Sequence, residues 1–295
     1  MFNKGLVILN AYIAYKSLLH LANRLKEEFA LLGIDIEVKN NAEIRTYIDH
    51  NGNLQNEALP VDFIVYLDKD PYISFMLEKA GYRLFNSAES IRLCDDKMLT
   101  YLSLMNQGIK MPKTVSGPLC YANIEDETFI RNLEKKLSFP MVSKTNYGSQ
   151  GRGVALIRNH EELVAREKEI AYSPRLYQED ITSSYGEDYR LIVIGGECVA
   201  AMKRINKNGD FRSNIALGGV GEEANLPASY LEIATKAASI LKLDYCGVDL
   251  LEGENNEPIL CEVNSNAFIE GIEKATKKNV ARAYANHIYQ LVYSL

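Results

Sequence analysis

Three oxygen-bearing side chains stand at short spacing near the end of the chain. Asp249 lies inside the apolar run Gly247–Leu251, and the run after the polar turn Glu252–Pro258 ends in Glu262-Val-Asn264. Two apolar runs around a polar turn predict an antiparallel hairpin, in which Glu262 and Asn264 share one face because side chains alternate along a strand. A buried carboxylate needs positive compensation, and oxygen ligands of this kind suit magnesium. The pattern therefore indicates a magnesium site, with an exposed acidic face as the alternative.

A glycine-rich segment, Lys144-Thr-Asn-Tyr-Gly-Ser-Gln-Gly-Arg-Gly153, is the second candidate for chemistry. Three glycines in a short polar loop between predicted strands let backbone N–H groups approach an anion closely. The segment is not a P-loop, because it lacks the lysine–hydroxyl pair that opens a helix. It is not a dinucleotide fingerprint either, since a strand follows it. Lys144 stands where the preceding strand ends, which favours phosphate as the partner; a flexible hairpin tip is the alternative.

Several isolated charges lie near these motifs. Lys97 falls in the first turn of a predicted helix, Asp96–Gln107, where the helix dipole disfavours a cation, so an anion is expected nearby. Asp188 and Arg190 are two residues apart on a predicted strand and share its face, and Arg204 lies near the end of the partner strand. A surface lysine and a structural salt bridge remain the alternative interpretations of Lys97 and Arg204.

The elements that position these residues alternate regularly over the first ninety residues. Strands are predicted at Gly5–Asn10, Ile34–Lys39, Asp62–Leu67 and Tyr82–Phe85, with helices at Tyr15–Leu32 and Pro71–Ala80. Alternating strands and helices predict a parallel sheet, whose ligands tend to sit at the carboxyl ends of the strands. Asn10–Tyr12 and Asp68–Asp70 lie at such ends and are candidate lining residues.

The remaining chain predicts mixed and antiparallel structure. The predicted strands are Met111–Val115, Met141–Lys144, Gly153–Ile157, Leu176–Ile181, Asp188–Ile194 and Glu197–Ile205, and the helices are Asn159–Ala171, Pro227–Leu241 and Lys277–Tyr293. A chain of 295 residues is long enough for two or three linked lobes.

Composition limits the classes of function. A net charge of −6 disfavours general nucleic-acid binding, which needs a basic face. The N-terminal segment has no uninterrupted apolar run able to span a bilayer and no signal-peptidase pattern, so we expect no membrane association. The five cysteines show no paired zinc spacing and indicate a reducing cytoplasm: Cys94, Cys120, Cys198, Cys246 and Cys261. The four histidines fall outside every motif.

In their order and spacing, these motifs resemble the ATP-grasp ligases, and more narrowly the RimK-type branch that adds α-linked glutamate or related residues. The similarity runs from about Asn86 to the end of the chain. It rests on Lys97, Lys144, Gln178-Glu179, Gly186-Glu-Asp-Tyr-Arg190, Gly209-Asp-Phe-Arg-Ser-Asn214, Asp249, Glu262-Val-Asn264 and Glu270-Gly-Ile-Glu273.

The resemblance implies an α/β chain with the ATP-grasp fold, whose ATP-binding lobes are α+β. It implies an N-terminal parallel-sheet lobe (residues 1–94), a central lobe with a glycine-rich lid (95–176) and a C-terminal antiparallel-sheet lobe with a metal site (177–295). Arg190, Arg204 and Arg212 would be catalytic, and Asp249, Glu262 and Asn264 would hold two magnesium ions, or manganese. ATP would contact Lys97, Lys144, Gly148, Ser149, Gln150, Gly151, Gly153, Gln178, Glu179, Asp180, Ile181, Asp188, Arg212, Ser213 and Asn214.

By resemblance, the reaction is an ATP- and magnesium-dependent ligation of a carboxylate to an amine through an acylphosphate. Its partners would be an amino acid, such as glutamate, and a small-molecule, cofactor or peptide acceptor, and the protein could be a homodimer or homotetramer. The chain departs from the branch after Asn264, where Ser265-Asn-Ala-Phe-Ile269 replaces the usual Ser-Pro-Gly pattern. Asn266 and Phe268 of this loop are candidates for contacting a substrate. The alternatives are an ATP-grasp ligase with another donor, of D-alanine–D-alanine-ligase or carboxylase type, and a catalytically silent ATP-binding regulator.

Overall fold

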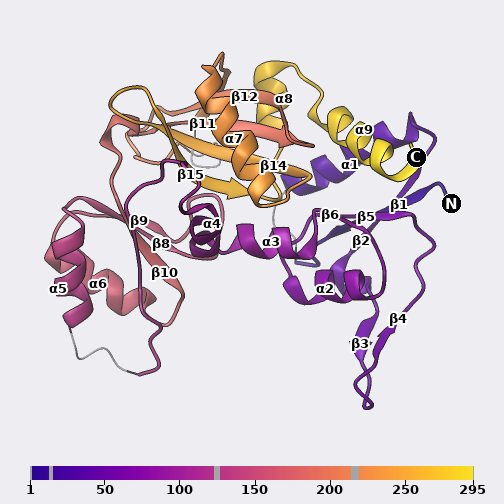
Figure 1. Cartoon of the computed structure of the whole chain (residues 1–295), viewed down its shortest axis with the longest axis horizontal. Helices are drawn as coiled ribbons and strands as arrows, with labels where there is room; N and C mark the ends of the chain where they lie inside the picture. Colours follow the sequence, from indigo (N-terminus) through magenta and orange to yellow (C-terminus); the bar gives the residue numbers. More distant parts are fainter. Residues whose placement is uncertain (1, 13–15, 123–126, 214–218, 295) are drawn as a thin grey trace.

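Three larger sheets, each built from a separate stretch of the chain, form the computed structural model of the protein (Figure 1). The structure describes residues 2–12, 16–122, 127–213 and 219–294. None of the helices in these ranges is long and apolar enough to cross a membrane.

The N-terminal sheet has the order β2-β1-β5-β6, and all of its strands run parallel, as the alternating pattern predicts. Its strands are β1 (Lys4–Leu9), β2 (Asp35–Asn40), β5 (Phe63–Tyr66) and β6 (Leu84–Phe85), and its helices are α1 (Lys16–Ala30) and α2 (Pro71–Lys79). A small hairpin, β3 (Thr46–Ile48) with β4 (Leu54–Asn56), projects from this lobe and was not predicted (Figure 1). The start of α2 is set by Asp70, whose side chain caps the first turn by accepting hydrogen bonds from the backbone N–H groups of Tyr72 and Ile73. Pro71 suits the first helical position because it needs no hydrogen-bond acceptor there.

Two short helices lead out of the first lobe. The structure places α3 at Ala88–Asp95, where no element is predicted from the sequence, and α4 at Lys97–Leu104. Asp96 separates them and caps α4 by accepting hydrogen bonds from the backbone of Met98 and Leu99. The predicted helix Asp96–Gln107 is therefore right in position but too long at its end.

The central sheet is antiparallel in the order β7-β10-β8-β9. Its strands are β7 (Thr114–Ser116), β8 (Met141–Thr145), β9 (Val154–Ile157) and β10 (Arg175–Glu179), and α5 (Thr128–Lys136) and α6 (His160–Ile170) cover one of its faces (Figure 1). Ile130, Leu133, Leu163 and Tyr177 form a core between these helices and the sheet. This core contains residues of the central lobe alone.

The third sheet is antiparallel in the order β13-β12-β11-β14-β15. Its strands are β11 (Glu187–Ile194), β12 (Glu197–Asn206), β13 (Gly219–Glu223), β14 (Tyr245–Glu252) and β15 (Pro258–Asn264). Three helices belong to this part of the chain. In sequence, α7 (Ala228–Ile240) lies between β13 and β14, and α8 (Glu270–Thr276) and α9 (Val280–Tyr293) come after β15. The prediction of one helix over Lys277–Tyr293 is wrong at its start, because Lys277 adopts a left-handed conformation that ends α8.

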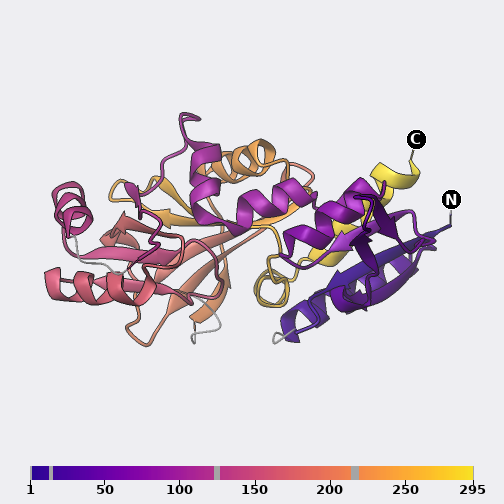
Figure 2. The ribbon, with the colours of Figure 1, turned by 90° about the horizontal axis from the view of Figure 1, so that it is seen from below.

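The C-terminal helix returns to the first lobe. In both views α9 lies beside α1, and the two ends of the chain lie at the same end of the molecule (Figures 1 and 2). One apolar core runs through this contact from Val7 and Phe63 of the first sheet to Ile192 and Tyr245 of the third. The first and third lobes are thus joined by a shared core. The predicted boundary between residues 176 and 177 lies inside β10, which belongs to the central sheet.

Candidate active site

Two neighbouring cavities lie where the three lobes meet. The first is lined by residues of the central sheet and of β14 and β15, and the second by the strand ends of the first lobe together with β11, β15 and the loop after β15. The second has a volume of about 690 Å³. Four residues line both cavities: Ser149, Arg152, Arg204 and Glu262. The two cavities therefore adjoin at these residues.

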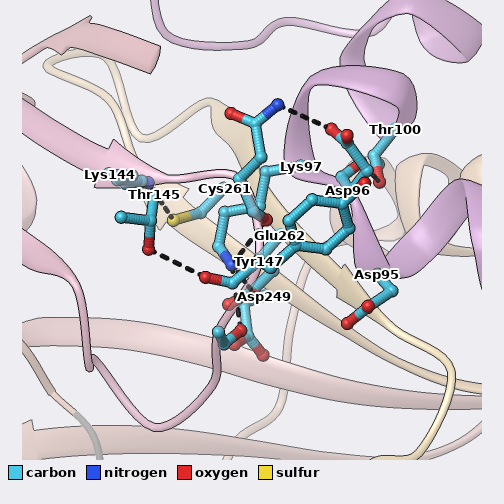
Figure 3. Close-up of polar contacts among 12 residues, drawn as sticks. Asp95, Asp96, Lys97, Thr100, Lys144, Thr145, Tyr147, Asp249, Cys261 and Glu262 are labelled. Atoms are coloured by element: carbon cyan, nitrogen blue, oxygen red, sulfur yellow. Dashed lines mark hydrogen bonds and ion pairs between the residues drawn. The ribbon is translucent and has the colours of Figure 1, made fainter. Parts of the chain in front are cut away.

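Lys97 connects three parts of the first cavity. Its Nζ donates to the carbonyl oxygens of Gly148 at 3.0 Å and Asn146 at 3.4 Å, and lies 3.4 Å from Oε1 of Glu262 (Figure 3). The side chain is buried, so its charge needs these oxygen partners. Asp96, the capping residue before it, also accepts a hydrogen bond from the Asn146 amide at 2.9 Å. The unfavourable position of the Lys97 charge at the start of α4 is thus offset by the Glu262 carboxylate and by the carbonyl oxygens of Asn146 and Gly148.

Lys144 is the penultimate residue of β8 and lines the same cavity. Its Nζ lies 3.7 Å from the Cys261 sulfur, and its side chain is buried (Figure 3). Burial alone would lower the pKa of Lys144, but the nearby Cys261, Tyr101 and Glu262 raise it above the usual lysine value. Lys144 therefore carries its positive charge at neutral pH and offers it to an anion in the cavity.

The glycine-rich loop joins β8 to β9 and covers this cavity. Gly148, Gly151 and Gly153 have φ values of 136°, 74° and 75°, which favour glycine, and a Cβ at Gly153 would clash with Oγ1 of Thr145. The Gly151 carbonyl accepts a hydrogen bond from Nη1 of Arg212 at 3.0 Å. Gly148, Ser149 and Gly151 line the first cavity, whereas Gln150 lines the second. The loop is held closed by contacts with Lys97 and Arg212.

A buried network of two arginines and two aspartates separates the cavities. Asp249 accepts hydrogen bonds from Nε and Nη2 of Arg190 at 2.7 and 2.6 Å, and Nη2 of Arg204 lies 2.9 Å from its Oδ2. Arg204 also forms a bidentate pair with Asp188, with Nε to Oδ1 at 2.6 Å. Burial would raise the pKa of Asp249, but Arg190 and Arg204 hold it below its ordinary value. Arg204 is thus a buried residue that positions both Asp188 and Asp249. The carboxylate of Asp188 is directed toward the guanidinium of Arg204.

The three residues expected to hold metal lie together. Asp249 and Glu262 are direct register partners across β14 and β15, and Asn264 is two residues farther along the same strand. A β-bulge at this point turns Cys261 toward the cavity beside Glu262, a feature that the sequence did not reveal. Within the described ranges, no group of three or more His, Cys, Asp and Glu residues is arranged to hold a metal by itself.

The donor set nevertheless fits magnesium. Two carboxylates and an amide oxygen are hard donors, and this ion normally completes its coordination with water and substrate phosphates instead of an all-protein cage. A carboxylate has about four acceptor sites, and Arg190 and Arg204 together use three of them, so Asp249 keeps one for the ion. The buried Nδ2 of Asn264 has no acceptor among the described residues and would need an acceptor oxygen of a ligand, such as a phosphate oxygen, which leaves the amide oxygen for the ion. Asp249, Glu262 and Asn264 would therefore hold the ion, with phosphate oxygens supplying the rest of its shell.

The strand that leaves the central sheet forms another wall of the first cavity. Gln178, Glu179, Asp180 and Ile181 all line it. The Gln178 amide donates to Oγ1 of Thr114 at 2.9 Å, and the Glu179 carboxylate accepts from the backbone of Lys113. The side chains of Gln178 and Glu179 thus hold β10 against β7 and the residue before it. Burial raises the pKa of Asp180 above its ordinary value.

The loop after β12 supplies the far wall. Arg212 pairs with Asp210 at 2.7 Å, and it lines the first cavity together with Ser213 and Phe211. Asn214, expected to contact the nucleotide, lies outside the described residues.

The loop that departs from the family pattern, Ser265–Ile269, lines the second cavity with Asn266, Ala267 and Phe268. The Asn266 amide donates to the backbone oxygen of Asp68 at 3.1 Å and so joins the third lobe to the first. Phe268 packs against the shared core. Of the strand-end residues, Asn10, Tyr12, Asp68 and Lys69 line this cavity, while Asp70 caps a helix instead.

Comparisons with known proteins agree with this arrangement. Residues 94–288 match the family model of the RimK-like ATP-grasp domain. Human beta-citrylglutamate synthase B is 34% identical over 233 residues, which make up 78% of this chain and 59% of the synthase. The chain thus spans less than two thirds of the length of that relative. A protein of Psychromonas ingrahamii named probable alpha-L-glutamate ligase is 35% identical over 280 residues, or 89% of each chain.

A solved structure supports the fold independently. An ATP-grasp ligase in complex with a minimal precursor, Mg and ADP matches 98% of both chains with a TM-score of 0.69. At 15% identity this likeness shows the fold alone. The expected ATP-grasp fold, with a parallel N-terminal sheet and two antiparallel sheets, is confirmed.

Proposed function

The chain belongs to the RimK-like ATP-grasp family, and from that premise we propose that it is an ATP- and magnesium-dependent carboxylate–amine ligase. It joins glutamate, or another amino acid, to a small-molecule, cofactor or peptide acceptor through an acylphosphate. ATP-grasp ligases use ATP and Mg, and the relatives named above are called a glutamate ligase and a citrylglutamate synthase.

One observation supports the proposal above the others. Nζ of Lys97 contacts the carbonyl of Gly148 in the loop and the carboxylate of Glu262 in the hairpin, from two lobes that are distant in sequence. Lys144 enters the same cavity within 3.7 Å of Cys261, the neighbour of Glu262. Positive charges, a backbone loop and oxygen ligands therefore converge on one space, as a bound triphosphate requires.

In the proposed reaction, a carboxylate oxygen of one substrate attacks the γ-phosphorus of ATP, and the bond to the β-phosphate oxygen breaks to release ADP. The amine nitrogen of the other substrate then attacks the acyl carbon, phosphate leaves, and the nitrogen loses a proton to give the amide. Lys97 and Lys144 hold phosphate oxygens as point charges, and the glycine-rich loop excludes water. Magnesium, when bound, would neutralise charge on the phosphate oxygens during transfer.

Of the three arginines, Arg190 acts on the substrate side of this site. Arg190 forms its two hydrogen bonds to Asp249 through Nε and Nη2, and it lines the second cavity. Its planar fork can therefore turn Nη1 toward a substrate carboxylate while Asp249 holds the group in place. Arg204 acts through Asp188 and Asp249, and Arg212 acts through the loop it closes.

Finer features of the proposal follow from the family resemblance, and the cellular location and the excluded partners follow from the composition and the N-terminal sequence. Two ions would be held, with Glu262 between them, and manganese could replace magnesium. The protein would work in the cytoplasm as a homodimer or homotetramer. It would not bind nucleic acid generally or associate with a membrane.

The test is a ligation assay on the whole chain. The protein is incubated with ATP, magnesium, L-glutamate and a panel of carboxylate and peptide acceptors, and both phosphate release and product mass are measured. We expect release that requires an acceptor and a product heavier than the acceptor by one or more glutamate residues. Failure to release phosphate with any pair of substrates, together with no nucleotide binding, would refute the proposal.

A further inference from the structure

The second cavity contains a carboxylate that the reaction described above does not use. Asp68 follows β5 at the carboxyl end of the parallel sheet, and only 8% of its surface is exposed. Its two oxygens accept hydrogen bonds from the Asn10 amide at 3.1 and 3.2 Å, from the Asn41 amide at 2.7 Å and from the Lys69 backbone at 2.7 Å. All of these donors are neutral, so they orient the carboxylate without cancelling its charge.

In the described part of the chain, Asp68 has neutral hydrogen-bond partners but no basic partner. Within the described ranges, it forms no ion pair, and the nearest lysine in sequence, Lys69, pairs instead with Asp95 at 2.8 Å. A nearly buried carboxylate without a counter-charge is costly, and a positive ligand group would relieve that cost. The three amides keep the anion facing the cavity whether or not such a group is bound.

A second, independent feature points to the same kind of ligand. Oδ1 of Asn266 is buried and accepts no hydrogen bond in the described part of the chain, although Asn266 also lines the cavity. The orientation of this amide is set by its other end, because Nδ2 donates to the backbone oxygen of Asp68 at 3.1 Å. The atom without a partner, Oδ1 of Asn266, is therefore a hydrogen-bond acceptor, and it lies in the same cavity as the Asp68 carboxylate. Together they call for a group that is both positively charged and rich in hydrogen-bond donors.

We propose that Asp68 and Asn266 form a subsite for the ammonium group of the amino-acid substrate. This inference rests on the proposed ligase function and extends it to the recognition of one substrate. Arg190 lines the same cavity, so a zwitterionic amino acid would place its carboxylate toward Arg190 and its ammonium toward Asp68. An ammonium group would bring the missing positive charge to the carboxylate of Asp68 and a donor to the free amide oxygen of Asn266.

The subsite can be tested by comparing two ligands that differ only in the ammonium group. Binding of L-glutamate and of glutarate, its analogue without the amino group, is measured by calorimetry with the whole chain, magnesium and a non-hydrolysable ATP analogue. We expect Asp68→Asn to weaken L-glutamate binding about ten- to a hundredfold, the range for a charged hydrogen bond, and to leave glutarate binding within twofold. Asn266→Leu should weaken L-glutamate alone as well, but by less.

The control is Asp35→Asn, which removes the same charge from an exposed position of the same lobe. It should bind both ligands as the wild type does. A purely structural role for Asp68 predicts equal losses for both ligands, which would overturn the subsite. Wild-type protein that binds glutarate as tightly as L-glutamate, or that binds neither ligand, would overturn it as well.

Failure of the subsite and failure of the ligase function give different results. If the wild type forms product but Asp68→Asn leaves the KM for L-glutamate unchanged, the subsite is refuted and the ligase function stands. If the wild type neither releases phosphate nor binds a nucleotide, but binds L-glutamate in a manner that depends on Asp68, the subsite stands and the proposed reaction is refuted.

Discussion

Replacing Asp249 by asparagine should destabilise the protein more than any change at a surface ion pair. Asp249 is 3% exposed and receives two hydrogen bonds from Arg190 and one close contact from Arg204. The substitution keeps the shape but removes the negative charge and turns an amide donor toward a guanidinium. Breaking a buried ion pair by removing one partner typically costs about 3–5 kcal/mol, because the remaining charge is left uncompensated. We expect a loss of this size in the free energy of unfolding.

The loss should depend on pH in a defined direction. The arginines hold the pKa of Asp249 below its ordinary value of 3.8, so the folded chain releases this proton more readily than the unfolded chain. The contribution of the carboxylate is therefore complete above the unfolded-state pKa and disappears as the pH falls through the lower, folded-state pKa. The wild type and the Asp249→Asn variant should differ most at neutral pH and converge in strong acid.

The measurement is urea unfolding followed by circular dichroism at several pH values. The matched control is Glu89→Gln, because Glu89 and Arg92 form a bidentate pair of the same geometry, at 2.8 and 2.7 Å, whose side chains are 53% and 42% exposed. That pair should contribute at most about 1 kcal/mol. If the two variants lose the same stability within error, burial does not decide the strength of these pairs and the reasoning fails.

Three further changes test the nucleotide side of the site. Glu262→Gln should lower kcat/KM by more than about a hundredfold and raise the magnesium concentration needed for turnover, because losing a metal ligand costs more than the roughly 10–100-fold typical of losing a residue that only supports a ligand. An unchanged magnesium titration would show that Glu262 does not bind the metal. Lys144→Met should raise the KM for ATP about tenfold or more, as the loss of a charged hydrogen bond does, and leave the KM for the amino acid unchanged; the reverse pattern would contradict a phosphate contact. Gly153→Ala should raise the KM for ATP, because the added Cβ would clash with Oγ1 of Thr145. The control is Gly196→Ala, which has a similar φ of 85° but open space around it and should leave this KM unchanged. Equal effects of the two substitutions would show that backbone strain alone is responsible.

The sequence predicted the parts of the site that depend on local pattern. Strand period correctly placed Glu262 and Asn264 on one strand, and the two apolar runs predicted the hairpin that sets Asp249 opposite Glu262. The glycine-rich loop was predicted between two strands because glycine spacing is a local property. The carboxyl ends of β1 and β5 were identified as a ligand edge, and Asn10 and Asp68 do line the second cavity there.

The parts that were missed depend on contacts between distant segments. The sequence showed that a buried Asp249 needed positive charge, but the two arginines reach it only because β11 lies between β12 and β14 in the sheet. The bulge that turns Cys261 toward Lys144 adds one residue to β15, and a hydrophobic pattern does not mark such an insertion. The break at Lys277 was missed because a left-handed lysine has no strong local signature, unlike a glycine.

The distribution of apolar cores indicates which wall of the first cavity can move. The first and third lobes share one core through α1 and α9, so separating them would expose a large apolar area. The helices of the central lobe pack on a core of their own, and the glycine-rich loop reaches the opposite wall through polar contacts such as Lys97 with Gly148 and Arg212 with Gly151. Polar contacts of this kind can be exchanged for contacts with phosphate at little net cost. For nucleotide exchange we therefore expect the glycine-rich loop, with α5 and α6, to move, while Asp68 and Arg190, which lie on the two lobes with a shared core, keep their relative positions.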